Sequence, residues 1–305
     1  MELDGAGPLR RQRLLAAGWT DDEVRSRVRS GELLALRRGA YLRDGERPRD
    51  AEAWHAVTIR AALPDLAPQV VISHASAVVL HGLPVWGFGL ERITATRARR
   101  SGARRTTGLH LHAAPLEAAE ITSAEGVPVT SVARTVVDMG RSVPFEQAVV
   151  LADAALHREL TTPDELLEAL QTAAGRPGCP RARRAIGFAD GRSESVGESR
   201  SRVAMLRAGL PAPVLQWPLS NRAGRQLGRV DFWWPQLRTV GEFDGRVKYG
   251  RLLEPGTAPG DAVFGEKVRE DRIRDEDVRV VRWIWSEIAP FDDVARRLSR
   301  AFGWS

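Results

Sequence analysis

Residues 228–245 read GRVDFWWPQLRTVGEFDG, and this stretch sets the expected fold of the C-terminal third of the chain. Apolar residues on both sides of Asp231 predict a strand, and a second strand is expected to end at Glu242 and Asp244. A carboxylate inside an apolar strand is costly to bury without a partner. The stretch therefore predicts two neighbouring strands that hold a group of acidic side chains.

The sequence around this stretch predicts a helix, a meander of strands, a charged helix and a last strand. The expected ranges are 195–208, 214–219, 228–234, 237–243, 266–274 and 278–285. A turn-rich segment, 220–225, separates the first two strands, so the first three strands are expected to be antiparallel. This order of elements is that of a restriction-endonuclease-like α/β core.

The acidic residues of this core suggest phosphodiester chemistry. Neighbouring strand ends can bring Asp231 and Glu242 together, and two close carboxylates repel each other unless a cation neutralises them. Oxygen ligands of this kind select Mg²⁺ or Mn²⁺, which polarise a phosphate and lower the pKa of an attacking water. Glu198, on the preceding helix, is a third candidate ligand; alternatively, it forms a surface salt bridge with Arg202.

Five short motifs connect this segment to a known family. They are Glu198-Ser199-Arg200, Val230-Asp231-Phe232, Glu242-Phe243-Asp244-Gly245, Glu266-Lys267 with Arg269-Glu270-Asp271, and Val280-Val281-Arg282-Trp283. Through them, residues 190–304 resemble the PD-(D/E)XK nuclease superfamily in its very-short-patch-repair (Vsr)-like branch. The resemblance implies metal ligation by Asp231 and Glu242, with Glu198 in support.

The same resemblance implies a catalytic lysine. The superfamily places it two residues after the glutamate, where this chain has Asp244. In the Vsr-like branch a later residue takes over, and Lys248 stands at that position. The chain has one other lysine, Lys267, which is the second candidate. The expected catalytic set is therefore Glu198, Asp231, Glu242, Asp244, Lys248 and Lys267.

The first fifty residues predict a winged helix. Residues 10–17 are expected to form a short helix, and Thr20 with Glu23 forms a capping box that opens a second helix through Arg29. A basic hairpin follows at 33–42.

Arginines of this module are the candidate DNA contacts. Arg25, Arg27 and Arg29 lie on the helix that can enter a major groove, and Arg37 and Arg38 lie on the wing that can meet phosphates. Alternatively, these arginines form a solvated surface that neighbouring acids balance.

Residues 51–180 predict a middle α+β domain. Helices are expected at 51–63, 73–80, 131–139 and 145–157, and strands at 109–112 and 127–129. His110 and His112 share one face of a strand, but the sequence places no third metal ligand near them. His74 and His81 are expected to make buried hydrogen bonds. Residues 171–192 predict a linker or a loosely packed helix, with a domain boundary near Asp190.

A second resemblance covers residues 7–157. The motifs are Gly39-Ala40-Tyr41, His74-Ala75-Ser76-Ala77, Leu80-His81-Gly82, Pro128-Val129-Thr130-Ser131, Arg134-Thr135 and Asp138. Together with the winged-helix outline, they resemble the AbiEi family of type IV antitoxins. This resemblance implies a possible toxin partner.

Composition narrows the class of protein. The 45 basic residues exceed the 39 acidic ones, which favours a polyanionic partner. The single cysteine, Cys179, excludes an internal disulfide and a zinc site of clustered cysteines, and a cytoplasmic location is expected. The longest uncharged run, 66–90, contains two prolines and two histidines, so it predicts a strand and a buried helix instead of a membrane span. The first fifteen residues, MELDGAGPLRRQRLL, lack the pattern of a secretory signal.

The sequence thus predicts a mixed α/β chain, α+β overall, with three domains: a winged helix at 1–50, an AbiEi-like domain at 51–180 and a nuclease-like domain at 190–305. The expected function is metal-dependent cleavage of nucleic acid, DNA being favoured, in phage defence or DNA repair. One alternative is a DNA-binding regulator or antitoxin whose nuclease fold has lost turnover. Another is a nuclease that acts on RNA, because phosphate chemistry does not separate the two substrates.

Overall fold

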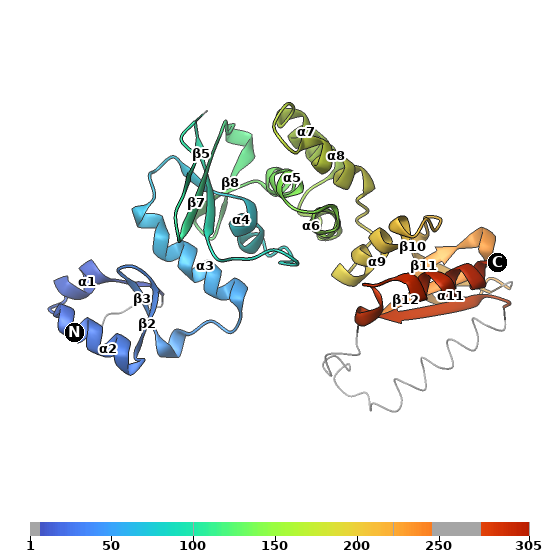
Figure 1. Cartoon of the computed structure of the whole chain (residues 1–305), viewed down its shortest axis with the longest axis horizontal. Helices are drawn as coiled ribbons and strands as arrows, with labels where there is room; N and C mark the ends of the chain where they lie inside the picture. Colours follow the sequence, from blue (N-terminus) through green and yellow to red (C-terminus); the bar gives the residue numbers. More distant parts are fainter. Residues whose placement is uncertain (1–6, 100, 222, 246–275, 305) are drawn as a thin grey trace. The chain divides into compact units, whose positions relative to one another are not determined.

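The computed structural model describes residues 7–99, 101–221, 223–245 and 276–304. The chain is a mixed α+β protein, as predicted, and its described residues form three sheets (Figure 1). It divides into two compact units: Met1–Leu151 with Glu159–Gly187, and Ala152–Arg158 with Phe188–Ser305. Within the described part of the chain, no helix has the length and apolar character needed to span a membrane.

The first unit begins with a small helical module and a three-stranded sheet. Its elements are β1 (Leu9–Arg10), α1 (Arg11–Ala16), α2 (Asp21–Ser30), β2 (Leu33–Arg37) and β3 (Ala40–Arg43), with sheet order β1-β3-β2. The predicted capping box is confirmed, because the Glu23 N–H donates to the Thr20 hydroxyl and the Thr20 N–H donates to the Glu23 carboxylate. Leu14, Val24 and Leu33 pack together beneath it.

A six-stranded sheet forms the centre of the first unit. Its elements are α3 (Ala51–Ala62), η2 (Leu63–Asp65), β4 (Val70–Ile72), α4 (His74–Leu80), β5 (Ile93–Ala98), β6 (Arg104–Arg105), β7 (Leu109–Ala114), β8 (Ile121–Ala124) and β9 (Val127–Thr130). The strand order is β6-β7-β5-β4-β9-β8. Ile59 and Ala77, from α3 and α4, pack against Ile72 and Val129 of the sheet.

Helices complete this unit. They are α5 (Val132–Ser142), α6 (Phe145–His157), α7 (Pro163–Thr172) and α8 (Cys179–Phe188), and the end of α6 belongs to the second unit. Ser131 caps α5, as expected, by accepting a hydrogen bond from the Arg134 N–H. Of the two interpretations of residues 171–192, the structure shows the helix, as α8, and not the linker. Cys179, Ala182 and Ala185 bury one face of this helix, so it is not loosely packed.

The second unit contains the predicted helix-and-meander core. Its elements are α9 (Val196–Arg207), β10 (Val214–Ser220), β11 (Gln226–Trp234), η4 (Pro235–Leu237), β12 (Thr239–Asp244), β13 (Arg279–Ile284) and α11 (Asp292–Phe302). The sheet order is β10-β11-β12-β13; the first three strands are antiparallel, as predicted, and β13 runs parallel to β12.

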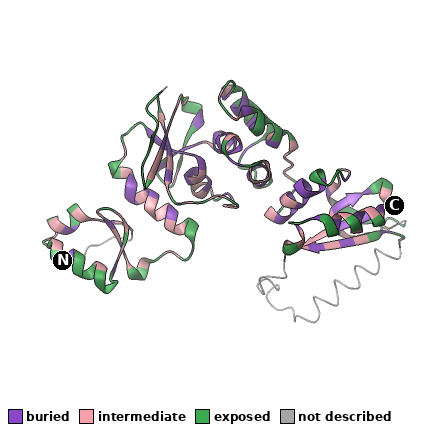
Figure 2. Ribbon diagram, viewed as in Figure 1, coloured by how far each residue is buried: buried purple, intermediate pink, exposed green. Residues whose placement is uncertain are grey.

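The core of this unit lies between the sheet and two helices. Met205 of α9 and Leu298 of α11 pack on the same cluster as Phe232 and Trp283 of the sheet. Buried positions accordingly gather on the strands and on the helix faces turned toward them (Figure 2). The charged helix predicted at 266–274 lies outside the described residues.

Candidate functional site

The start of α9 sits unusually close to β12. A Cβ atom added to Gly197 would lie 1.9 Å from the ring of Phe243, so only glycine allows this approach. Ser195 caps the helix by accepting a hydrogen bond of 3.1 Å from the Glu198 N–H. The first turn of α9 therefore holds Glu198 beside the sheet.

Glu198 is buried among neutral hydrogen-bond donors. Its carboxylate accepts from the Ser195 hydroxyl at 2.7 Å, the Glu194 N–H at 2.9 Å and the Gln216 amide at 2.9 Å. Burial raises the pKa of Glu198 above its ordinary value, and the nearby charge of Asp231 raises it further.

Arg202 does not pair with Glu198. Its guanidinium contacts the buried carboxylate of Asp153 at 2.7 Å and donates to the carbonyl of Phe188. The alternative of a surface salt bridge between Glu198 and Arg202 is therefore wrong, and Glu198 is left facing the sheet.

Gln216, on β10, joins two of the predicted residues. Its side-chain nitrogen lies 2.9 Å from Glu198 Oε2 and 3.4 Å from Asp231 Oδ1. The pairs Leu215–Phe232 and Trp217–Val230 on either side place Gln216 opposite Asp231 in the register. Its φ of 50° is in the left-handed region, a strained conformation for a side chain of this size. Sequence reasoning missed Gln216, although a polar residue between apolar neighbours was the available signal.

Asp231 and Glu242 lie at adjoining positions of β11 and β12. The ladder pairs Phe232 with Gly241, and one more step in this register faces Asp231 with Glu242. At that point the Phe243 N–H donates to Asp231 Oδ2 at 2.8 Å. Glu242 contacts Arg282 of β13 at 2.9 Å.

These observations define a carboxylate site made of Glu198, Gln216, Asp231 and Glu242. Asp244, at the end of β12, is half-buried, and Lys248 and Lys267 lie outside the described residues. In the described ranges, no three or more His, Cys, Asp or Glu side chains are arranged to hold a metal ion. The site offers carboxylate oxygens from three elements, which are the donors that Mg²⁺ and Mn²⁺ take.

The five candidate DNA-contacting arginines differ in their surroundings. Arg25 forms an exposed ion pair with Asp22, Arg27 pairs with Glu32, and Arg37 pairs with Asp65. Arg29 and Arg38 are exposed and have no carboxylate partner in the part of the chain that the structure describes.

The histidines of the first unit form a cluster that the sequence did not predict. His112 stacks on His74, with ring centroids 3.8 Å apart, and His110 lies 4.0 Å from His112. The hydrogen bond expected of His81 is present, because its Nε2–H donates to the carbonyl oxygen of Thr130 at 2.7 Å. The nitrogen atoms of parallel stacked rings do not point at a common position. The three rings of this cluster are therefore not arranged to bind a metal ion.

Comparisons with known proteins give relatives but no activity. No family model matches the sequence. The uncharacterized proteins Rv2248 and MT2308, from two strains of Mycobacterium tuberculosis, are each 33% identical over 199 residues, which is 63% of this chain and 72% of theirs. The crystal structure of the RV2827C protein from M. tuberculosis aligns with a TM-score of 0.41 and 19% identity, over 68% of this chain and 78% of that one. The chain belongs to the family of Rv2248 and MT2308.

Proposed function

We propose that the second unit is a metal-dependent nuclease domain that cleaves nucleic-acid phosphodiesters, with DNA as the favoured substrate. The observation that carries this proposal is the hydrogen-bonded link from Glu198 through Gln216 to Asp231. It gathers acidic residues from a helix and a strand that lie well apart in the sequence. Glu242 adjoins them through the register of β11 and β12.

The chemistry of the donor set, carboxylate oxygens from α9, β11 and β12, suits a divalent cation. Asp231 and Glu242 are the proposed main ligands for Mg²⁺ or Mn²⁺, with Glu198 in support. Burial raises the pKa of Glu198, so a cation that offsets its charge is favourable there. When bound, such an ion polarises the scissile phosphate and lowers the pKa of an attacking water.

Neighbouring groups of the chain orient the carboxylates. The Gln216 amide fixes Glu198 relative to Asp231, and the Phe243 N–H fixes the second oxygen of Asp231. Lys248 is the proposed cation that holds the nucleophile, with Lys267 as the second candidate. A positioned cation of this kind is typically worth about 2–4 kcal/mol in the transition state.

One observation favours a second candidate function, a DNA-binding regulator or antitoxin without turnover. Arg282 contacts Glu242 at 2.9 Å, and this ion pair satisfies the carboxylate without a metal. Under this alternative, the carboxylate site stabilises the fold. The AbiEi-like region would bind a toxin partner.

DNA binding is proposed for the N-terminal module under both functions. Arg29 and Arg38 are exposed and have no carboxylate partner in the described segments. They can therefore contact phosphates without breaking an ion pair to a described residue. Arg25, Arg27 and Arg37 first have to leave Asp22, Glu32 and Asp65. Binding through these arginines falls steeply with salt, because each phosphate contact releases counterions.

A cleavage assay on the full chain tests the proposal. Single- and double-stranded DNA and RNA are incubated with Mg²⁺ or Mn²⁺, and Asp231→Asn is compared with Asp292→Asn, an exposed acid of α11. We expect cleavage by the parent, a loss of at least about a thousandfold in Asp231→Asn, and a parental rate in Asp292→Asn.

Other outcomes of this assay separate the alternatives. Equal cleavage rates in Asp231→Asn and the parent contradict the assignment of Asp231 to the site. Cleavage of RNA but not of DNA makes RNA the substrate class. Salt-dependent DNA binding without cleavage by any variant supports the regulator. A cleavage rate that falls by about a hundredfold or more in Lys248→Ala assigns the lysine role to Lys248, whereas a parental rate moves that role to Lys267.

A further inference from the structure

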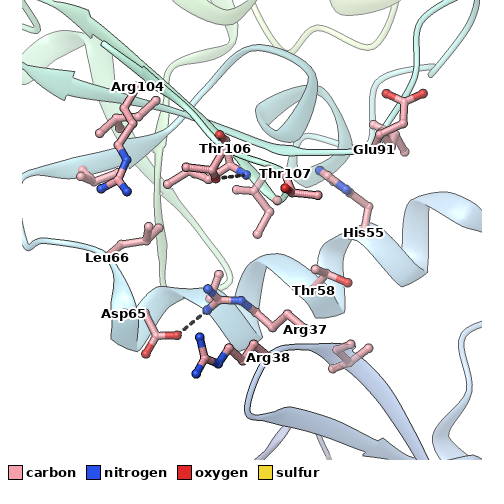
Figure 3. Close-up of a pocket in the computed structure, with 18 of the residues that line it drawn as sticks. Arg37, Arg38, His55, Thr58, Asp65, Leu66, Glu91, Arg104, Thr106 and Thr107 are labelled. Atoms are coloured by element: carbon pink, nitrogen blue, oxygen red, sulfur yellow. Dashed lines mark hydrogen bonds and ion pairs between the residues drawn. The ribbon is translucent and has the colours of Figure 1, made fainter. Parts of the chain in front are cut away.

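A cavity of about 830 Å³ lies in the first unit, well away in sequence from the carboxylate site. It is bounded by the β2–β3 hairpin, by α3, and by the strands β5, β6 and β7 (Figure 3). Leu36, Trp54 and Leu66 give it an apolar lining. A volume and lining of this kind are typical of pockets that take small organic molecules.

Four arginines also line this cavity. Arg37 and Arg38 approach from the hairpin, and Arg104 approaches from the sheet on the other side (Figure 3). Arg97, at the end of β5, is the fourth. Asp65 forms ion pairs with Arg37 and with Arg10, which lies outside the lining.

The remaining three arginines outnumber the one other acid of the lining, Glu91, so the cavity keeps positive charge. Across the described ranges, Arg38, Arg97 and Arg104 have no carboxylate partner. Arg97 donates one hydrogen bond to the Gly102 carbonyl at 2.7 Å, and its Nε atom is buried without a partner among the described residues. A buried donor without an acceptor is costly, so an acceptor bound in the cavity would be favourable for Arg97.

We propose that this cavity binds a small organic anion with an apolar body. Arg38, Arg97 and Arg104 would hold its oxyanion, a carboxylate or a phosphate, through charge-assisted hydrogen bonds. Trp54 and the leucines would pack on its apolar part. The partly apolar lining and the carboxylates of Asp65 and Glu91 favour a small anion with an apolar body over an extended nucleic-acid backbone.

Binding at this cavity has a consequence for the hairpin. Arg38 also belongs to the set proposed to contact DNA phosphates, so the ligand and DNA would compete for it. This consequence rests on the proposed DNA binding, whereas ligand binding itself does not. By linkage, the ligand would weaken DNA binding by the same factor by which DNA weakens ligand binding.

The test uses two fluorescent probes on the full chain without nucleic acid. The anionic probe is 8-anilinonaphthalene-1-sulfonate, and the uncharged probe is N-phenyl-1-naphthylamine, which has the same apolar body. Arg104→Ala and Arg38→Ala are compared with Arg105→Ala, the next residue of β6, which is exposed and does not line the cavity. Urea denaturation checks that each variant is folded.

We expect saturable binding of the anionic probe that weakens about tenfold or more in Arg104→Ala and Arg38→Ala, and less than about twofold in Arg105→Ala. Binding of the uncharged probe should not respond to these changes. Displacement by benzoate or by phenyl phosphate then distinguishes the two oxyanions. Equal binding of both probes, or no response to Arg104→Ala, overturns the proposal. So does an Arg104→Ala variant that loses DNA binding but keeps the anionic probe.

Discussion

Each of the two units holds a group of acidic side chains that is buried at least in part, but the two groups balance the charge of their buried acids differently. In the first unit, an arginine–carboxylate cluster consists of Glu120, Arg134, Asp138 and Arg141. Arg134 contacts Glu120 at 2.6 Å and Asp138 at 2.7 Å, and Arg141 contacts Asp138 at 2.8 Å. Each carboxylate of this cluster thus has a guanidinium group in direct contact.

In the second unit, the hydrogen-bond donors that Glu198 meets among the described residues are neutral. A backbone N–H, a hydroxyl and the Gln216 amide satisfy its hydrogen bonds without offsetting its charge. Burial raises the pKa of this carboxyl, so a proton or a cation is favourable there. Under the proposed function, the first group serves stability, whereas the second binds a cation. Perturbed acids of this kind gather at functional sites.

The largest expected effect comes from breaking the arginine–carboxylate cluster. Arg134→Met leaves Glu120 buried without its cation, and removing one partner of a buried pair typically costs about 3–5 kcal/mol. Urea denaturation followed by circular dichroism measures this loss. Arg25→Met, which removes an exposed pair with Asp22, is the control and should cost less than about 1 kcal/mol. If both variants lose the same stability, the cluster is not structural.

A smaller loss of stability is expected when α9 is moved away from β12. In Gly197→Ala, the added methyl group meets the ring of Phe243, and overpacking of this kind costs about 1–3 kcal/mol. The matched control is Gly187→Ala on α8, where a Cβ atom meets nothing and helix propensity favours alanine by about 0.5–1 kcal/mol. Opposite signs in urea denaturation support the close approach, and a parental stability of Gly197→Ala contradicts it.

Local signals in the sequence predicted most of the helices and strands. The pair Thr20 and Glu23 marks the start of α2, and Ser131 marks the start of α5, because a cap depends on residues within one turn. The strand expected at 237–243 begins at Thr239 instead. Pro235–Leu237 forms a short turn, and Arg238 adopts a left-handed conformation with φ of 42°.

Contacts between residues far apart in the sequence could not be predicted from the sequence alone. Asp231 and Glu242 were identified as acids at strand ends, which the alternation of residue types makes visible. Placing Gln216 in the site requires the register of β10 against β11. Likewise, Asp153, the partner of Arg202, lies on a different helix. Such pairings are set by packing of the whole unit, so a single sequence does not specify them.

The histidine cluster predicts how the first unit responds to acid. Burial lowers the pKa of His74 to about 4 and that of His112 to about 3, with Arg134 and Arg141 also disfavouring the charge of His74. The unfolded chain binds protons below pH 6.5, whereas the folded unit does not, so stability present at neutral pH is lost as the pH falls.

The size of this acid effect follows from the shift. His74 contributes up to about 1.4 kcal/mol per pH unit between its unfolded and folded pKa values, and His112 contributes less because solvent partly screens it. Urea midpoints at pH 7, 6 and 5 measure the slope. His112→Phe keeps a stacked ring on His74 and should flatten that slope, and an unchanged slope would contradict the titration.

The smallest expected effect concerns Glu198 and bears most directly on the difference between the two acidic groups. The folded pKa of Glu198 is raised, so its contribution to stability is present at low pH and is lost as the pH rises above its ordinary value. Glu198→Gln removes this loss and keeps the hydrogen bonds, because the Ser195 hydroxyl can accept as well as donate. We expect this variant to be as stable as the parent at pH 5 and more stable at pH 8, by up to about 1 kcal/mol.

Glu165→Gln serves as the control of opposite sign. Hydrogen bonds from the backbone of Thr162 and the side chain of Thr161 lower the pKa of Glu165, so its contribution is present at neutral pH and lost in acid. Glu165→Gln should therefore be less stable than the parent at pH 8, whereas Glu198→Gln should be more stable.

Thermal denaturation with and without Mn²⁺ completes the test, because a cation that binds the folded parent raises its midpoint of unfolding. The carboxylate site is kept for a cation if Glu198→Gln gains stability without Mn²⁺ and loses part of the Mn²⁺-induced rise. If Glu198→Gln loses stability at pH 8 as Glu165→Gln does, Glu198 is a structural acid like Glu120, and the difference between the two units disappears.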